Sequence, residues 1–323
     1  MKILRTIGCT VLIAFLLFTP KLLVENAQRE FTDQRFVRDT DRYRGTIVLY
    51  HIVRQRPYIG SLTAWLNKRA EAYEKKHRGT YIVVEGMDEA SFRERLEYGR
   101  RADAYSFFSG SLYGDLLQPF TPHEVPLREG LFCTDRCVPY CYSGVCLLRK
   151  NPSGTGGKRY YSDDVTAARL HASVNEATEE QADLLYTDLR RAGDLIRYKD
   201  GFSLGELLAV DSFTDSVCWL GIDRDTDEKK AEVIAAFFDW LRAEDTQKTL
   251  DSLGLLSVRA DVKSEPPDTQ LKEIFRTYAS VQTVDPFRWY AEYDTLREDA
   301  ILARSGDTDA DRRFTNRLQE LIG

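Results

Sequence analysis

Apolar runs alternate with helically periodic segments in the first third of the chain. The continuous run Thr46–Ile52 is rich in β-branched and aromatic residues, which is typical of a strand covered on both faces. Two further runs, 81–85 and 102–108, are separated by segments with three- and four-residue spacing, 62–77 and 89–99. Strands that alternate with helices in this way predict a parallel sheet covered by helices.

Beyond Pro119 the pattern becomes less regular. Two extended stretches are predicted, at 138–148 and 207–222, and a short helix is expected to end at Gly254. Helical periodicity predicts further helices at 165–171, 176–193, 228–241, 271–278, 287–303 and 314–322. The chain as a whole is therefore predicted to be an α/β protein.

The N-terminus carries a short apolar run, Ile7–Phe18, with positive charge before it. Residues 1–24 are interpreted as a signal peptide or an N-terminal membrane anchor. Both interpretations stay open, because the best cleavage residue, Ala27, has Glu25 at its minus-three position. The polar stretch 25–45 is expected to be a tether. Either interpretation predicts an extracytoplasmic protein, anchored at the outer face of the cytoplasmic membrane or secreted.

Composition narrows the classes of partner. The 323 residues include 51 acidic and 45 basic side chains, for a net charge of −6. Binding to nucleic acid needs a surplus of Lys and Arg, so no nucleic-acid partner is expected. A hydrophobic content of 43% excludes a disordered chain, and the length suggests two lobes. The four His and six Cys show no metal-ligand spacing, so no metal or other cofactor is expected.

Known catalytic and metal-binding motifs match the chain only in part. The segment 154–158 lacks the first glycine and the final hydroxyl residue of a phosphate loop. The segments 223–227 and 307–311 lack the glycine and the glutamate of a calcium loop. The prediction is that the protein is not an enzyme. A secreted hydrolase remains a further alternative, because paired glycosidase carboxylates leave no motif.

Several segments beyond Thr46 keep a distinctive order along the chain. They include a tryptophan-containing helix, a short strand, a crossing strand and a return segment, namely Trp65, Ala102–Ala104, Leu117–Pro119, Val138–Tyr140, Phe237–Leu241 and Leu253–Val258. In this order they resemble an extracellular solute-binding protein of an ABC importer, of the carbohydrate type within the type II periplasmic-binding-protein-like family. The resemblance covers residues 46–323.

The resemblance implies two α/β lobes, each a helix-covered sheet, joined by crossing strands. It places residues 46–135 and 223–262 in the first lobe, and 136–222 and 263–323 in the second. It also implies a small-molecule solute held between the lobes, the permease of an ABC transporter as partner, and a monomeric protein. The segment 152–206 is shorter than in the family. A membrane-anchored sensor or adaptor without transport function therefore remains an alternative.

Aromatic residues make up 11% of the chain. Sugar faces stack on aromatic rings while their hydroxyls bind polar groups, so a sugar or oligosaccharide is the favoured solute. Ligands in such sheets bind at the carboxyl ends of the strands. Six residues after strands, on crossings or on the last facing helix are expected to line one interlobe cavity: Tyr50, Ser109, Gly110, Tyr140, Asp215 and Trp289. For the aromatic residues, packing in a core is the alternative. Asp215, like Asp211, has the alternatives of capping a turn or pairing with an arginine.

Five cysteines lie on or near the two predicted crossing stretches. In an extended stretch, Cys137 and Cys141 would face the same side and Cys146 the other. One disulfide, free buried thiols and a metal site all remain open. If a bridge forms, Cys133 with Cys137 is the expected pair, because a bond to Cys218 would cross the hinge and restrict closure.

Overall fold

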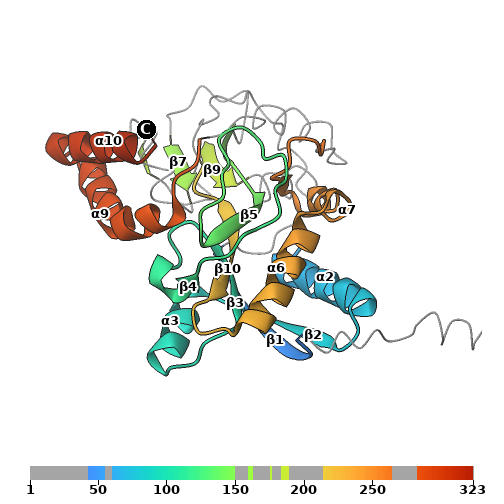
Figure 1. Ribbon diagram of the computed structural model, residues 1–323. Coiled ribbons are helices and arrows are strands. Elements are labelled where there is room, and N and C mark those ends of the chain that lie inside the picture. Colours follow the sequence, from blue (N-terminus) through green and yellow to red (C-terminus); the bar gives the residue numbers. More distant parts are fainter. Residues whose placement is uncertain are drawn as a thin grey trace, which may run out of the picture. The chain divides into compact units, whose positions relative to one another are not determined.

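The computed structural model describes residues 43–54, 60–149, 159–162, 175–176, 183–188, 214–263 and 282–322 (Figure 1). Several sequence predictions lie outside these residues: the segment 1–24, nearly all of the tether, the helices at 165–171 and 271–278, and Asp211.

A seven-stranded sheet forms the centre of the described structure. Its strand order is β11-β5-β10-β3-β1-β2, and the short strand β4 also pairs with β10. The three strands predicted in the first third are present and parallel, and helices join them as expected. Their bounds are β1 Gly45–Ile52, α2 Leu62–Lys76, β2 Thr80–Met87, α3 Glu89–Glu97 and β3 Ala104–Phe108.

Helices cover both faces of this sheet. On one face lie α2 and α6, which spans Glu228–Arg242, and they contact each other as well as the strands (Figure 1). Phe92 of α3 packs on the opposite face with Tyr105 of β3. Side-chain caps explain where α2 and α6 begin, because Ser61 accepts from the amide of Ala64 and Asp227 accepts from Lys230.

The remaining strands of the sheet run antiparallel to β3 or to β10. They are β4 Leu117–Gln118, β5 Cys137–Tyr142, β10 Val217–Asp223 and β11 Leu256–Ser257. The 3₁₀ helix η1, Gly114–Leu116, leads into β4, and α7, Glu244–Gln247, and η2, Leu250–Leu253, lead to β11. The predicted second lobe begins at residue 136 and so includes β5 and most of β10. Both strands pair within the seven-stranded sheet.

A β-bulge interrupts the ladder between β5 and β10. Cys218 is opposite Cys141 while the next residue, Trp219, is opposite Pro139, so Tyr140 is the extra residue. Across the bulge, residues two or four positions apart in the sequence no longer face the same side of the sheet. Cys137 therefore packs in the cluster on the α3 face and Cys141 in the cluster on the α2–α6 face. The prediction that both face the same side is wrong, because parity holds only in an unbulged strand.

The predicted extended stretch 138–148 is two strands. It breaks at Ser143 and Gly144 and continues as β6, Val145–Arg149, in a second sheet. This sheet has four strands in the order β6-β9-β7-β8, with β7 at Arg159–Ser162, β8 at Asn175–Glu176 and β9 at Leu184–Asp188.

The helix predicted at 176–193 is wrong where β9 lies. Leu184 and Leu185 are buried, and β9 pairs along its length with β6 on one side and with β7 on the other. The polar residues before this short apolar run favour a helix locally. Pairing between two neighbouring strands outweighs that local preference.

Two long helices complete the described chain, α9 Pro286–Arg304 and α10 Thr308–Ile322 (Figure 1). They pack on each other through a third cluster that includes Trp289, Leu296, Phe314 and Leu318. Asp285 caps α9 by accepting from the amides of Phe287 and Arg288, and Pro286 occupies its first turn. Both helices confirm the periodicity of the sequence, and α10 begins before its predicted start at Phe314.

Candidate functional site

Polar residues gather beyond the carboxyl ends of β1 and β3. Arg54 follows β1 by two residues, and Ser109 comes directly after β3. Because β10 is antiparallel to β3, with Cys218 opposite Phe108, Asp215 lies just beyond the same edge of the sheet. Three segments far apart in the sequence therefore meet where an open α/β sheet binds its ligands.

Arg54 is the centre of this group. Its Nη2 donates to Asp215 Oδ2 at 2.7 Å, and its Nη1 donates to the backbone oxygen of Ser109 at 3.2 Å. The guanidinium carbon lies 5.7 Å from the centre of the Tyr293 ring on α9. The side chains of Arg54 and Asp215 are 19% and 8% exposed, so this ion pair is largely shielded from water. Such a pair holds its two partners in a defined geometry.

The turn Ser109–Gly110 positions an indole against the site. Ser109 Oγ accepts from Nε1 of Trp219 at 2.9 Å, which fixes the hydroxyl. Gly110 has φ +83°, and a Cβ built on it would lie 2.7 Å from Cδ1 of Trp289. The amide of Gly110 also donates to the backbone oxygen of Pro286. This glycine is therefore required both by its backbone conformation and by the close approach of Trp289.

A network of hydroxyl and backbone hydrogen bonds joins the segments that leave the seven-stranded sheet. Thr214 Oγ1 donates to the backbone oxygen of Ser143 at 2.6 Å, and the amide of Ser143 donates to Ser216. The amide of Thr214 in turn donates to the backbone oxygen of Gln282. We refer to Ser143, Thr214, Ser216 and Gln282 as the crossing network. It connects the end of β5, the start of β10 and the approach to α9 next to the ion pair.

Four of the six predicted site residues lie in this region, namely Ser109, Gly110, Asp215 and Trp289. Tyr50 and Tyr140 lie apart from them, in clusters on opposite faces of the sheet. Tyr50 packs edge-on against Tyr105 and beneath the guanidinium of Arg95. Both tyrosines occupy strand positions whose side chains point into a face rather than beyond the strand end.

Tyr140 belongs to a buried polar chain in the sheet. Its hydroxyl lies 2.8 Å from Ser106 Oγ and 3.2 Å from the sulfur of Cys218, and its ring stacks on Trp65. His51 Nδ1 extends the chain, at 2.9 Å from Ser106 Oγ. Burial raises the pKa of Tyr140 well above its ordinary value, so the phenol stays neutral. This chain satisfies polar groups in the core, which is the alternative that the sequence left open for Tyr140.

Arg54 and Tyr293 were not among the residues predicted to line the site. Arg54 could have been found from its position just after a predicted buried strand. Tyr293 follows Trp289 by one helical turn and so occupies the same side of α9. Thr214 and Ser143 carry no comparable signal, because single hydroxyl residues occur throughout the chain.

Cys133, Cys137 and Cys218 are free thiols. The predicted Cys133–Cys137 disulfide is absent, because the two sulfurs have different neighbours. Cys133 Sγ lies 3.6 Å from Nη2 of Arg242, whereas Cys137 Sγ lies 3.2 Å from Oγ1 of Thr134. Burial raises the pKa of Cys137 well above its ordinary value. Cys218 is a buried thiol, as expected for the strand next to Cys141.

The described residues contain neither a group of metal ligands nor a membrane-spanning helix. No three His, Cys, Asp or Glu side chains gather there as metal ligands would. None of the helices in the described ranges is long and apolar enough to cross a membrane.

Comparison with known proteins identifies the fold. No protein-family model and no curated protein sequence matches the chain. The GacH receptor of Streptomyces glaucescens, solved unliganded and with acarbose, matches with a TM-score of 0.57 and 13% identity, over 87% of this chain and 99% of that chain. The maltose/maltodextrin-binding domain MalE from Bdellovibrio bacteriovorus, bound to maltotriose, matches with a TM-score of 0.55 and 13% identity, over 86% and 100%.

A third match has a different type of ligand. AgtB from A.tumefacien R10, in complex with agropinic acid, has a TM-score of 0.51 and 14% identity, over 79% of this chain and 97% of that chain. These neighbours are binding proteins rather than enzymes. The chain has the two-lobed α/β fold of the periplasmic solute-binding proteins of ABC importers, so the fold implied by the sequence resemblance is confirmed.

Proposed function

We propose that the protein is an extracytoplasmic solute-binding protein that captures a small solute between its lobes and delivers it to the permease of an ABC importer. The observation that supports this most directly is the position of the Arg54–Asp215 pair. It lies beyond the carboxyl ends of β1 and β3, beside the crossing network. A group at that place has access to a ligand held between two lobes.

We further propose that the solute is a neutral, hydroxylated molecule, with a sugar or oligosaccharide as the favoured class. Arg54 and Asp215 pair at 2.7 Å, so the group places hydrogen-bond donors and acceptors side by side, and a hydroxyl can use both. The ring of Tyr293, which packs 6.2 Å from the buried ring of Trp289, lies next to it and supplies apolar surface. Acarbose and maltotriose, which GacH and MalE bind, belong to this class, whereas the agropinic acid bound by AgtB is an acid.

The proposed hinge consists of the segments joined by the crossing network. β5 belongs to the seven-stranded sheet and β6 to the four-stranded sheet, so the chain passes from one sheet to the other at Ser143 and Gly144. Thr214 and Gln282 are hydrogen-bonded beside that passage. Rotation about a few residues at element ends is how two-lobed binding proteins close.

A solute screen on the full chain tests this proposal. Neutral oligosaccharides, monosaccharides, amino acids, peptides and carboxylic acids are compared by thermal unfolding and by solution scattering. A cognate solute at about a hundredfold excess over its Kd should stabilise the folded state by about 2.7 kcal/mol and decrease the radius of gyration. D215N should weaken that binding, while E298Q, on an exposed part of α9, should leave it unchanged.

The alternatives predict different outcomes of the same screen. If only acidic solutes bind, the proposed neutral class is wrong and the solute-binding role remains. If no solute in any class shifts the melting temperature or the radius, the transport role is wrong and an anchored sensor or adaptor is favoured. Turnover of a sugar by the full chain would instead identify a hydrolase.

A further inference from the structure

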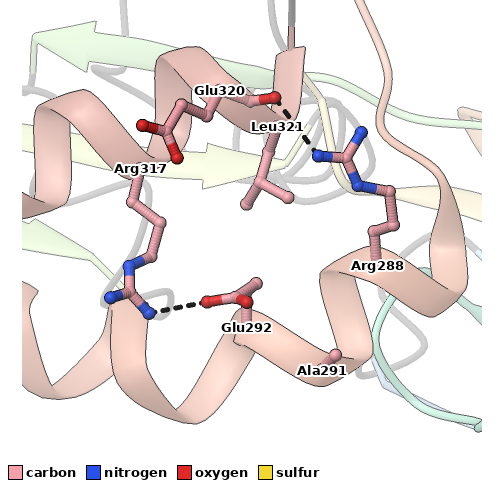
Figure 2. A pocket seen from close by; sticks show the side chains of 6 residues that line it. All are labelled: Arg288, Ala291, Glu292, Arg317, Glu320 and Leu321. Atoms are coloured by element: carbon pink, nitrogen blue, oxygen red, sulfur yellow. Dashed lines mark hydrogen bonds and ion pairs between the residues drawn. The ribbon is translucent and has the colours of Figure 1, made fainter.

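A pocket of about 280 Å³ lies between α9 and α10, apart from the candidate functional site (Figure 2). It is lined by Arg288, Ala291 and Glu292 of α9 and by Arg317, Glu320 and Leu321 of α10. Trp289 and Tyr293, the residues of α9 at the candidate functional site, pack in the cluster between the helices and do not line this pocket. We refer to this feature as the α9–α10 pocket.

Two contacts between the helices frame the pocket. Arg317 Nη1 donates to Glu292 Oε2 at 2.6 Å, and this pair is about one-third exposed. Arg288 Nη2 donates to the backbone oxygen of Glu320 at 3.4 Å, in the last turn of α10. Figure 2 shows both contacts, with the side chain of Leu321 between them. The open space is thus bounded by charged groups and has an apolar wall.

Two of the charged groups lack a charged partner. Among the residues that the structure describes, the guanidinium of Arg288 forms no ion pair and its one side-chain hydrogen bond is to a neutral carbonyl. The carboxylate of Glu320 has neither an ion pair nor a hydrogen bond in the same part of the chain. Figure 2 shows this carboxylate pointing away from Arg288, on the other side of Leu321. The pocket therefore presents one unpaired cation and one unpaired anion at separate places.

We infer that the α9–α10 pocket binds a small zwitterion, a molecule of amino-acid size whose carboxylate pairs with Arg288 and whose ammonium group pairs with Glu320. A simple anion would gain the contact with Arg288 but would also meet the carboxylates of Glu292 and Glu320. A simple cation would gain Glu320 but meet two guanidinium groups. Only a ligand with both charges gives each unpaired group an opposite charge. Short methylene groups between the charges would contact Leu321 and Ala291.

The size of the pocket agrees with this class. A volume of about 280 Å³ leaves room for a molecule of amino-acid size. Arg288 and Glu320 are exposed, and an exposed ion pair contributes at most about 1 kcal/mol. Two such pairs contribute at most about 2 kcal/mol, so a Kd of about 30 mM is expected.

The pocket shares α9 with the candidate functional site. Arg288 and Trp289 are neighbours in the first turns of the helix, and that end of α9 contacts the turn after β3 through Pro286 and Gly110. A ligand that fixes α9 against α10 would also fix Trp289 against Gly110. Any such effect on solute binding must be reciprocal. The inference about the pocket itself does not depend on the identity of that solute.

The test is a titration of the full chain, followed by NMR chemical shifts, with γ-aminobutyrate and β-alanine as zwitterions. Butyrate and butylammonium carry one charge each and serve as matched probes. Both zwitterions are expected to bind, and each one-charge probe should bind about fivefold more weakly, as expected for the loss of about 1 kcal/mol. R288M and E320Q should each weaken γ-aminobutyrate binding by a similar factor.

Control variants locate the effect. R297M and E298Q remove exposed charges elsewhere on α9 and should leave the affinity unchanged. D215N should also leave it unchanged, which separates this pocket from the solute site. The charge-reversed variant R288E/E320R should again bind γ-aminobutyrate, with the ammonium group now next to position 288 and the carboxylate next to position 320. This variant keeps the net charge of the pocket, so it tests the inference even if a single variant folds poorly. The inference is overturned if no zwitterion binds at about 100 mM, a few times the expected Kd, if butyrate binds as tightly as γ-aminobutyrate, or if R288M and E320Q have no effect.

Discussion

Replacing Gly110 with alanine should destabilise the protein through two separate contributions. The backbone at Gly110 has φ +83°, a conformation that costs a residue with a Cβ about 1–2 kcal/mol. The new Cβ would also lie 2.7 Å from Cδ1 of Trp289, a fully buried side chain with little freedom to move. Overpacking of this type costs typically about 1–3 kcal/mol. The two contributions together predict a decrease of about 2–5 kcal/mol in the free energy of unfolding.

Gly99 provides a control for the backbone contribution alone. It also has a positive φ, of +68°, but a Cβ there would meet nothing within 4 Å. G99A should therefore cost only about 1–2 kcal/mol. Both variants are compared with the parent chain by urea unfolding followed by tryptophan fluorescence. The difference between G110A and G99A measures the steric contribution.

A double-mutant cycle tests whether Trp289 is the group that alanine contacts. W289L removes the indole, so G110A should cost less in the W289L background than in the parent chain, by about 1 kcal/mol or more. Equal costs of G110A and G99A, or strict additivity of G110A and W289L, would refute the close approach of Trp289 to this turn.

Three further predictions concern ionisable groups. R54M should lower the free energy of unfolding by about 3 kcal/mol in urea melts, because it removes the arginine that pairs with the buried Asp215. R54M/D215N should recover part of that loss. If the double variant is as unstable as R54M, the prediction is wrong. A thiol reagent should label the exposed Cys133 before the buried Cys137, as measured by peptide mapping. Faster labelling of Cys137 would show that the segment before β5 is not arranged as described. Burial raises the pKa of Tyr142 from 10.0 to about 12, so the stability that its neutral phenol contributes is present below pH 10 and is lost as the pH rises towards 12. In melts between pH 10 and 12, Y142F should therefore lose less stability than the parent chain. Equal losses in the two proteins would refute this prediction.

The first lobe was largely predictable from the sequence because its elements follow local rules. The run Thr46–Ile52 is apolar throughout, since a strand with helices on both sides of its sheet is buried on both faces. The start of α6 was predictable as well, because Asp227 caps a helix whose apolar residues share one face. The strand β9 was not predictable in this way. Its five residues depend on β6 and β7 for their conformation, and neither neighbour is adjacent to β9 in sequence.

The candidate site was predictable only where position along a strand decides it. Ser109 was predicted because it follows a strand, and Asp215 because an ionised carboxylate on an apolar crossing stretch needs a partner; the structure places both beyond the same end of the sheet. Tyr140 packs in the core on the α2–α6 face, which is the alternative that the sequence left open, and its position on a crossing stretch could not decide between core and cavity. The ion pair of Asp215 with Arg54 joins residues 161 positions apart. The sequence left an arginine partner open without indicating which one.

The bulge at Tyr140 places two consecutive side chains of β5 on the same face of the sheet. Tyr140 and Cys141 both pack in the cluster on the α2–α6 face, while Tyr142 packs on the α3 face. Deleting Tyr140 would restore regular alternation in β5, with Cys141 still opposite Cys218 and Tyr142 still opposite Val217. The neighbouring side chains would keep their faces, but Ser106 Oγ and Cys218 Sγ would lose the hydroxyl that lies 2.8 and 3.2 Å from them. The extra residue thus adds a buried polar group to the sheet, so we expect its deletion to lower stability without changing the register of the strands.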